Sequence, residues 1–143
     1  MFVAQDKSDS ILFNTQYVKD ISFENIKVPN SLYNETKSKI NVSININANS
    51  ILDRKHEVIL EIKVTSIKNS DFEYIIDLKY AGIFTIKKTV NANEKEKLIC
   101  IQCPSLLFPY ARRIISDLSR DGGYLPLYIL PIDFFALYNK KLG

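Results

Sequence analysis

Apolar and polar residues alternate along four segments of the chain, and this period of two predicts four β-strands. In the first strand, which begins at Ile11, the pattern assigns Ile11, Phe13, Tyr17, Ile21 and Phe23 to the buried face, and Asn14, Gln16, Asp20, Ser22 and Glu24 to the other. The inward residues of the next three strands are predicted to be Ile40, Val42, Ile44, Ile46 and Ala48, then Val58, Leu60, Ile62 and Val64, then Phe72, Tyr74, Ile76, Leu78, Tyr80, Phe84 and Ile86.

The segments between these strands predict how they are joined. Residues 25–39 form a long connection, whereas Asn49–Asp53 and Lys68–Asp71 have the composition of short turns. Strands joined by short turns pair antiparallel, and such a sheet keeps one face in water.

The spacing of apolar residues changes to three and four after Cys103, which predicts a helix. Pro104 suits its first turn, and Gly122-Gly123 ends it. Pro109 is expected to kink this helix or to separate its first turn. The apolar face consists of Leu107, Tyr110, Ala111, Ile114, Ile115 and Leu118.

The remaining segments predict a charged loop at Thr89–Lys97, an extended linker between Pro126 and Pro131, and a second helix from Ile132 to about Leu142. The prediction is therefore an α+β fold, a four-stranded antiparallel sheet followed by two helices. It is expected to be one domain over residues 1–143, with residues 1–10 flexible.

The predicted helices are too narrow to cover the predicted sheet. A helix is about 10 Å wide, whereas four strands spaced by about 4.8 Å present a wider face. A monomer rarely leaves a large apolar surface in water. The pattern therefore indicates an oligomer, a surface that binds other chains, or both.

Composition narrows the class of protein. No stretch is long and apolar enough to span a membrane, and no secretory signal precedes the first strand, so the chain is expected to stay in the cytoplasm. The net charge is +3, but the basic residues are scattered in short pairs among acids. Nucleic-acid-binding proteins usually concentrate basic residues on one face, so no nucleic-acid partner is predicted. A basic nucleic-acid-binding oligomer is kept as an alternative.

Candidate catalytic residues are few. His56 is the one histidine, and it is interpreted as a strand-edge residue and not as part of a triad. Cys100 and Cys103 have the spacing of a redox pair or half a zinc site, but they also suit the apolar entry of a helix, which is the preferred interpretation. No enzyme, cofactor or metal site is predicted.

Four segments resemble the SecB family of protein-export chaperones. Cys103-Pro-Ser-Leu-Leu-Phe-Pro-Tyr-Ala-Arg112, followed by Pro126-Leu-Tyr-Ile-Leu-Pro-Ile-Asp-Phe134, is similar to the family's signature. Tyr17–Glu24 resembles its first strand, and Tyr80–Ile86 the end of its fourth. The resemblance implies a homotetramer built as a dimer of dimers. It also implies an ATP-independent holdase that binds unfolded preproteins in apolar grooves and passes them to the translocase ATPase SecA.

The resemblance also implies roles for particular residues. A SecA-binding patch would consist of Asp20, Glu24, Ile75 and Asp77. Client contacts would come from Leu32, Tyr33, Ile40, Val42, Ile44, Phe134, Phe135, Leu137 and Tyr138. The apolar face of the long helix would lie at the centre of the tetramer.

The chain departs from the family in charge. SecB proteins are usually acidic and often end in an acidic tail, whereas this chain is net basic and ends in Asn139-Lys-Lys-Leu-Gly143. Arg113 stands where the family often has an acid, and the chain has no tryptophan. These departures bear on the SecA contact more than on client holding. A SecB-like chaperone dedicated to one client, such as an antitoxin, is the alternative within the fold.

Overall fold

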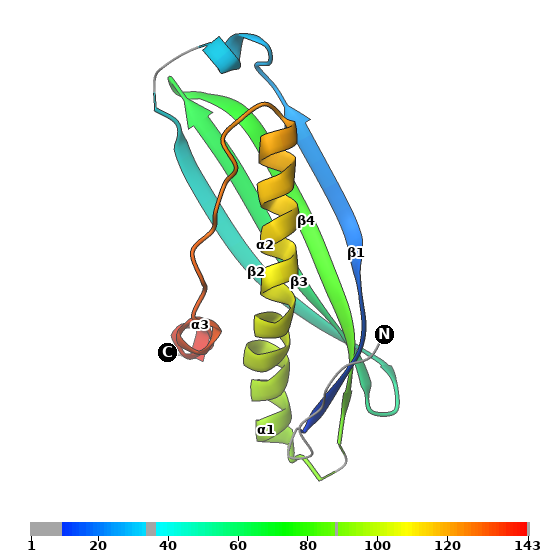
Figure 1. Ribbon diagram of the computed structural model, residues 1–143. Coiled ribbons are helices and arrows are strands. Elements are labelled where there is room, and N and C mark those ends of the chain that lie inside the picture. Colours follow the sequence, from blue (N-terminus) through cyan, green and yellow to red (C-terminus); the bar gives the residue numbers. More distant parts are fainter. Residues whose placement is uncertain (1–9, 34–36, 88, 143) are drawn as a thin grey trace.

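The computed structural model describes residues 10–33, 37–87 and 89–142, which form one antiparallel sheet with helices along one face (Figure 1). The strands are β1 (Ile11–Asn25), β2 (Lys39–Leu52), β3 (Lys55–Lys68) and β4 (Asp71–Ile86). Their order across the sheet is β1-β4-β3-β2, so β3 and β4 are central and β1 and β2 are the edges. The predicted α+β class is confirmed.

Two tight hairpins join β2, β3 and β4. The β3–β4 turn lies at Asn69 and Ser70, within the predicted segment. The β2–β3 turn was predicted too early, because β2 continues to Leu52 and the turn lies at Asp53 and Arg54. Asn49-Ser50-Ile51-Leu52 does not alternate and is rich in turn-forming residues at its start, so the sequence alone did not show that the strand continues to Leu52.

The β3–β4 turn predicts a stabilising substitution. Asn69 and Ser70 have φ angles of 53° and 67°, the left-handed conformation in which a serine side chain is disfavoured by about 1 kcal/mol. Ser70→Gly is therefore expected to raise the free energy of unfolding by roughly 1 kcal/mol, measured by denaturant titration. The matched change Ser50→Gly, within a strand, should lower it instead.

The predicted faces of β1 need correction at Gln16 and Tyr17. The register of β1 against β4 shifts between Phe13 and Thr15 and again between Val18 and Asp20. Between these bulges the side chains exchange faces, so Tyr17 pairs with Ala81 on the face away from the helices. An uninterrupted period of two cannot anticipate an inserted residue. The prediction that Tyr17 faces the core is wrong, and so is the prediction that Gln16 faces away from it, because Gln16 pairs with Gly82 on the helix side.

The helical layer begins earlier than predicted. Helix α1 (Ala92–Lys97), a π-helical turn (Leu98–Gln102) and α2 (Cys103–Asp121) follow one another with helical backbone angles at each junction. The charged loop predicted for 89–97 is therefore largely helix. Its overlooked signal is a capping sequence, because the Asn91 side chain accepts a hydrogen bond of 2.9 Å from the Glu94 amide.

Prolines alter this helix without dividing it. Pro104 has no N–H to donate to the turn before it, and there the Cys103 amide bonds to Leu98 O, five residues back. Ser105 Oγ donates to Ile101 O at 2.6 Å. Pro109 lies inside α2, which continues to Asp121, so no separate first turn forms there.

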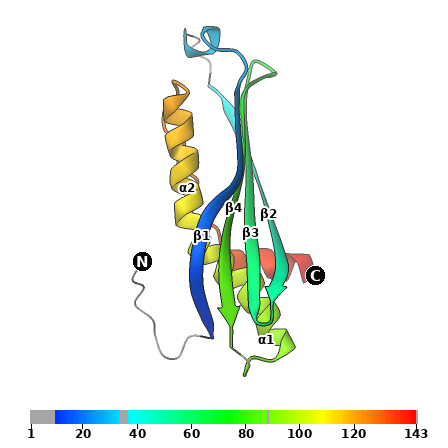
Figure 2. The ribbon, with the colours of Figure 1, turned by 90° about the vertical axis from the view of Figure 1, so that its right-hand side faces the viewer.

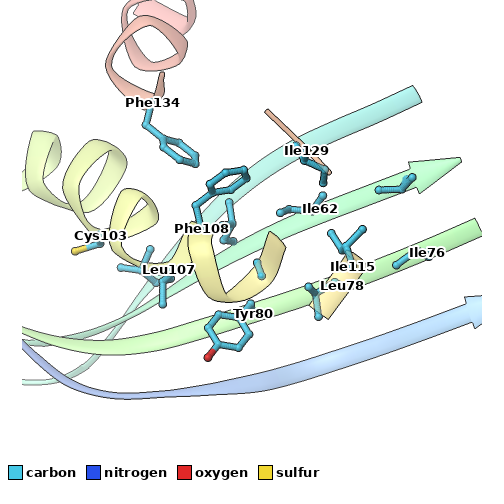
Figure 3. Close-up of a cluster of buried hydrophobic side chains, with 14 of the residues drawn as sticks. Ile62, Ile76, Leu78, Tyr80, Cys103, Leu107, Phe108, Ile115, Ile129 and Phe134 are labelled. Atoms are coloured by element: carbon cyan, nitrogen blue, oxygen red, sulfur yellow. The ribbon is translucent and has the colours of Figure 1, made fainter. Parts of the chain in front are cut away.

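Helix α2 contacts β3 and β4, and it lies on one face of the sheet (Figure 2). Leu107, Ala111 and Ile115 are fully buried on the strand side, together with Leu60, Ile62, Ile76 and Leu78 of the sheet. Figure 3 shows five of them, Leu107, Ile115, Ile62, Ile76 and Leu78. Gly82 permits close approach, because a Cβ there would lie 2.9 Å from Leu107 Cδ2. The core therefore sits over the two central strands.

The chain then returns through an extended linker, residues 122–133, to α3 (Phe134–Leu142) (Figure 1). Helix α3 starts two residues later than predicted, because Asp133 caps it by accepting a hydrogen bond from the Ala136 amide at 3.0 Å. Phe134 meets Phe108 of α2 edge to face, with ring centroids 6.0 Å apart. This contact attaches α3 to the core.

Candidate functional site

Large apolar side chains remain exposed on the β2 side of α2. The linker contributes Leu125, Tyr128 and Leu130, which are 89%, 74% and 81% exposed. Ile40 and Val42 of β2 pair with Ser66 and Val64 of β3, and Val64 faces the helices. Ile40 and Val42 are nevertheless 36% and 40% exposed. Tyr33, in a short 3-10 helix (Asn30–Tyr33), and Phe135 of α3 are also exposed. We call these seven residues the apolar strip.

The strip contains only part of the residues predicted to contact clients. Tyr33, Ile40, Val42 and Phe135 belong to it, and Leu32 is exposed beside Gly123. The other four, Ile44, Phe134, Leu137 and Tyr138, are buried or half-buried in the chain's own core. The structure therefore separates the predicted set into accessible residues and residues that support them.

The linker residues of the strip were not predicted as a site. Their signal was the apolar run Leu125-Pro-Leu-Tyr-Ile-Leu130, because an extended segment can bury only one of its sides. Leu127 and Ile129 take the buried side. Leu125, Tyr128 and Leu130 are left in water.

A buried polar network positions the 3-10 helix. Glu73 is almost fully buried, and its Oε1 accepts hydrogen bonds of 3.0 Å from Ser38 and Ser66. Lys68 Nζ lies 3.2 Å from Glu73 Oε2 and donates to Ser31 O at 3.2 Å. The network thus connects β3 and β4 to the 3-10 helix that carries Leu32 and Tyr33, through Ser31, and to the start of β2, through Ser38.

A second set of hydrogen bonds joins this connection to the end of α2. Tyr124 OH lies 2.8 Å from Ser31 Oγ and donates to Asn25 Oδ1 at 2.6 Å, while Asn25 Nδ2 donates to Gly122 O at 2.9 Å. Tyr124 also packs on Tyr74. These bonds connect the 3-10 helix that carries Tyr33 to the end of α2.

The opposite face of the sheet brings together the four residues predicted to bind SecA. Glu24 pairs with Ile75, Ser22 with Asp77, and Asp20 with Lys79. All of them face away from the helices, as the alternation predicted. Asp20 and Glu24 are exposed, whereas Asp77 is partly buried. Lys63 and Lys79 lie among these acids, so the face is mixed in charge.

Next to these acids, Tyr17 and Lys19 hold Glu57 across the sheet. Tyr17 OH donates to Glu57 Oε2, and Lys19 Nζ lies 2.7 Å from Glu57 Oε1. The hydrogen bonds from Lys19 and from Tyr17 lower the pKa of Glu57. Burial, reinforced by Glu57, raises the pKa of Tyr17 to about 12. The bulges in β1 thus place Tyr17 where it ties β1 to β3.

The residues predicted for the tetramer centre divide between two sides of α2. Leu107, Ala111 and Ile115 are fully buried against the chain's own sheet, and Ile114 and Leu118 are half-buried. Tyr110 is exposed, as are Leu106 and Arg113. Leu106, Tyr110 and Arg113 form the side of α2 that is accessible to another subunit.

Cys103 has the environment of a core residue. It is fully buried, and burial raises the pKa of its thiol to about 12, which disfavours the thiolate that redox chemistry and metal binding need. No cluster of His, Cys, Asp and Glu side chains suitable for a metal occurs among the residues that the structure describes. Nor do they include a helix with the length and apolar character needed to cross a membrane.

His56 is not the strand-edge residue that was predicted. It lies in the central strand β3, pairs with Ser50 and Phe84, and is buried. Burial and then the charge of Lys95 lower its pKa, so the imidazole is neutral at pH 7. The register of β3 against β4 turns the side chain toward α1, beside Lys95.

This environment predicts a pH dependence. Because the folded pKa lies below the unfolded value of 6.5, the unfolded chain binds more protons, and stability should fall as pH drops through 6.5. In denaturant titrations between pH 7.5 and 5.0, the wild type should lose more stability than His56→Gln. Equal losses would contradict the assignment, since the chain has one histidine.

The fold and its strip define the class of protein. A sheet with one helical layer that leaves a band of apolar side chains in water presents a surface for binding other chains. The chain belongs to the SecB family, since the family model described as preprotein translocase subunit SecB matches residues 4–143. SecB proteins are chaperones and not enzymes, so the chain is assigned to a family of protein-export chaperones.

Similar proteins agree with this family. The protein-export protein SecB of Bartonella quintana is 44% identical over 90% of this chain and 82% of its own length. That of Rhodospirillum centenum is 36% identical over 97% and 83%. A solved SecB-like chaperone from Mycobacterium tuberculosis, in complex with a peptide from an antitoxin, has a TM-score of 0.72 over 86% of this chain and 91% of its own. At 12% identity, it supports the fold alone.

Proposed function

We propose that this protein is an ATP-independent holdase that binds unfolded preproteins through the apolar strip and delivers them to SecA in the cytoplasm. The observation that carries the proposal is the exposure of the strip in a chain of this family. A ligand that binds the unfolded state and not the native state draws a client away from folding and aggregation. Exposed apolar side chains supply such binding without sequence specificity.

Dilution of a denatured precursor tests client holding. Wild-type protein should suppress its aggregation equally with and without ATP. Tyr33→Ser with Phe135→Ser should weaken binding about tenfold or more, because each aromatic ring contributes roughly 1–2 kcal/mol when covered. The control is Leu52→Ser, which removes a side chain 67% exposed at a hairpin, compared with 83% and 57% for the pair. Equal loss in control and variant would refute the strip.

We propose the outer face around Asp20, Glu24, Ile75 and Asp77 as the SecA contact. Their common side of the sheet and the exposure of the two β1 acids support this role. Asp20→Lys with Glu24→Lys should weaken SecA binding at moderate salt, chiefly through the association rate, and leave client holding unchanged. Asp77 is left intact because one of its carboxylate oxygens is buried.

A matched charge change separates this contact from net charge. Asp71→Lys with Asp121→Lys replaces two exposed acids, one at the β3–β4 hairpin and one at the end of α2. It changes the net charge by the same amount as Asp20→Lys with Glu24→Lys. Titration calorimetry and stopped-flow association with SecA should show little change for this control. If both variants weaken the complex alike, the outer face has no specific role.

We also propose a homotetramer built as a dimer of dimers. Its support is the exposed side of α2 with Leu106, Tyr110 and Arg113, together with the family. Light scattering should give about four times the chain mass of 16.4 kDa. A mass of one chain at micromolar concentration would refute this state.

A chaperone dedicated to one client is the second candidate. We raise it because the SecB-like chaperone with the similar fold has an antitoxin peptide in its structure. A general holdase should suppress aggregation of several unrelated precursors, whereas a dedicated one should act on one of them. The comparison needs only the aggregation assay.

A further inference from the structure

A basic pocket lies at the end of the sheet far from the 3-10 helix. The β2–β3 turn, the end of β4 and α1 come together there, as both ribbon views show (Figure 1 and Figure 2). The pocket has a volume of about 220 Å³, and its polar lining consists of Asp53, Arg54, His56, Lys87 and Lys95. None of these residues belongs to the apolar strip or to the proposed SecA contact.

The charges on the wall of this pocket are unbalanced. Arg54, Lys87 and Lys95 are cationic, whereas Asp53 is the acid among the described residues that line it. Arg54 Nε lies 3.8 Å from Asp53 Oδ2, but both side chains are exposed, and an exposed pair contributes little. The wall therefore has a surplus of two positive charges, which favours an anion in the pocket.

His56 adds a buried polar atom that lacks a partner. The residue lines the pocket yet is only 5% exposed, and its Nε2 makes no hydrogen bond to any residue that the structure describes. A buried polar atom nearly always has a partner, which is protein, ordered water or a bound ion. The side chains of Lys95 and Arg54 only donate hydrogen bonds, so neither accepts one from an imidazole N–H. An anion with several oxygens accepts from all three side chains.

We propose that this pocket binds a phosphate group, held by Arg54, Lys87 and Lys95 beside the imidazole of His56. A phosphate monoester carries a charge of about −1.5 to −2 at pH 7 and has three strong acceptor oxygens, so it matches the surplus charge and the donors of the wall. A carboxylate carries a single negative charge and leaves part of that surplus. A guanidinium also binds phosphate through two parallel hydrogen bonds. This inference does not depend on the holdase function, because the pocket shares no residue with the apolar strip.

The tip of the neighbouring hairpin bears on the source of the phosphate. Ile51 and Leu52 are 46% and 67% exposed, and Arg54 and Lys55, just beyond the turn, are exposed as well. Exposed aliphatic side chains beside basic ones are typical of surfaces that bind anionic lipids. A lipid headgroup and a dissolved phosphate ester present the same chemistry to the pocket, so the experiment has one arm for each source.

Nuclear magnetic resonance of the imidazole tests the pocket directly, because His56 is the one histidine of the chain. Inorganic phosphate, exchanged for chloride at constant ionic strength, should shift the imidazole signals to a plateau. The pKa of His56 should be higher in saturating phosphate than in chloride, because the bound anion opposes the positive charges of Lys95, Lys87 and Arg54. Asp53, the facing acid, is ionised in both solutions.

Paired variants separate the pocket from net charge. Arg54→Gln with Lys95→Gln should lower the affinity for inorganic phosphate at least about tenfold, because each removes a charged donor. Lys39→Gln with Lys63→Gln removes the same charge from exposed lysines that do not line the pocket and should stay within about twofold. Amide spectra confirm that the variants fold, and Arg54→Gln alone should give an intermediate loss. A shift without a plateau, or equal losses in both pairs, would overturn the proposal.

Vesicles identify the source of the phosphate. Wild-type protein should co-sediment with phosphatidylcholine vesicles that contain phosphatidic acid, a phosphate monoester, and not with phosphatidylcholine alone. Ile51→Ser with Leu52→Ser should abolish this binding and keep the affinity for inorganic phosphate. Binding of phosphate without binding of vesicles supports the pocket as a site for a dissolved ester, which glycerol 3-phosphate then tests. Vesicle binding that survives Arg54→Gln with Lys95→Gln would overturn the lipid headgroup as the ligand of the pocket.

Discussion

Replacement of Glu73 by alanine is expected to lower the free energy of unfolding by about 3 kcal/mol. The change leaves the Lys68 ammonium, 13% exposed, without the carboxylate that lies 3.2 Å from it. It also removes the acceptor of the buried Ser66 hydroxyl. Both losses arise because a polar group that stays buried cannot recover its bonds from water. Denaturant titration measures the effect.

Two controls isolate the buried pair. Glu73→Gln retains an acceptor for Ser66 and should cost less than alanine. Asp71→Ala, which removes an exposed carboxylate 3.8 Å from Lys27, should cost less than about 1 kcal/mol. If Asp71→Ala were as costly as Glu73→Ala, burial would not explain the effect. Proteolysis near Leu32 should increase in Glu73→Ala, because the network holds that connection.

Leu107→Ala is expected to lower the free energy of unfolding by about 3 kcal/mol. Leu107 is fully buried where α2 packs against Gly82 of β4, so its truncation removes packing and leaves a cavity. Thermal or denaturant unfolding measures this loss. The difference in free energy of unfolding between wild type and variant should not depend on protein concentration, provided that the variant still assembles, because the cavity lies within one chain.

Leu106→Ala is the matched control on the next residue. Leu106 is 39% exposed, and its truncation should cost under about 1 kcal/mol in the isolated chain. If this side of α2 contacts another subunit, Leu106→Ala should instead shift the mass measured at low protein concentration. Equal destabilisation by the two changes would mean that α2 does not face the sheet as described.

The strand pattern was predictable where register is uninterrupted. Val58, Leu60, Ile62 and Val64 face the helices as predicted, because each pairs directly with the even-numbered residues of β4. The same reasoning failed for Tyr17, where two bulges exchange the faces. Bulges depend on how two strands twist against each other, and single-strand periodicity contains no information about that.

The candidate site was predictable in part for the same reason. The sharing of one face by Asp20, Glu24, Ile75 and Asp77 follows from alternation within two strands that become neighbours. Whether an apolar residue is exposed does not follow from alternation, because Phe134 and Phe135 differ by one position yet one is buried and the other is not. Their exposure depends on where α3 docks.

Local sequence alone determined the type of most elements, since alternation, i to i+4 spacing and turn residues act between neighbours in the chain. It also determined that apolar surface would exceed what the helices cover. Tertiary structure decided which edge of the sheet remains open, that Glu73 and Lys68 are buried together, and that the linker leaves Leu125, Tyr128 and Leu130 in water. These features depend on contacts between residues distant in sequence, whose geometry is set only when the whole sheet and α2 pack.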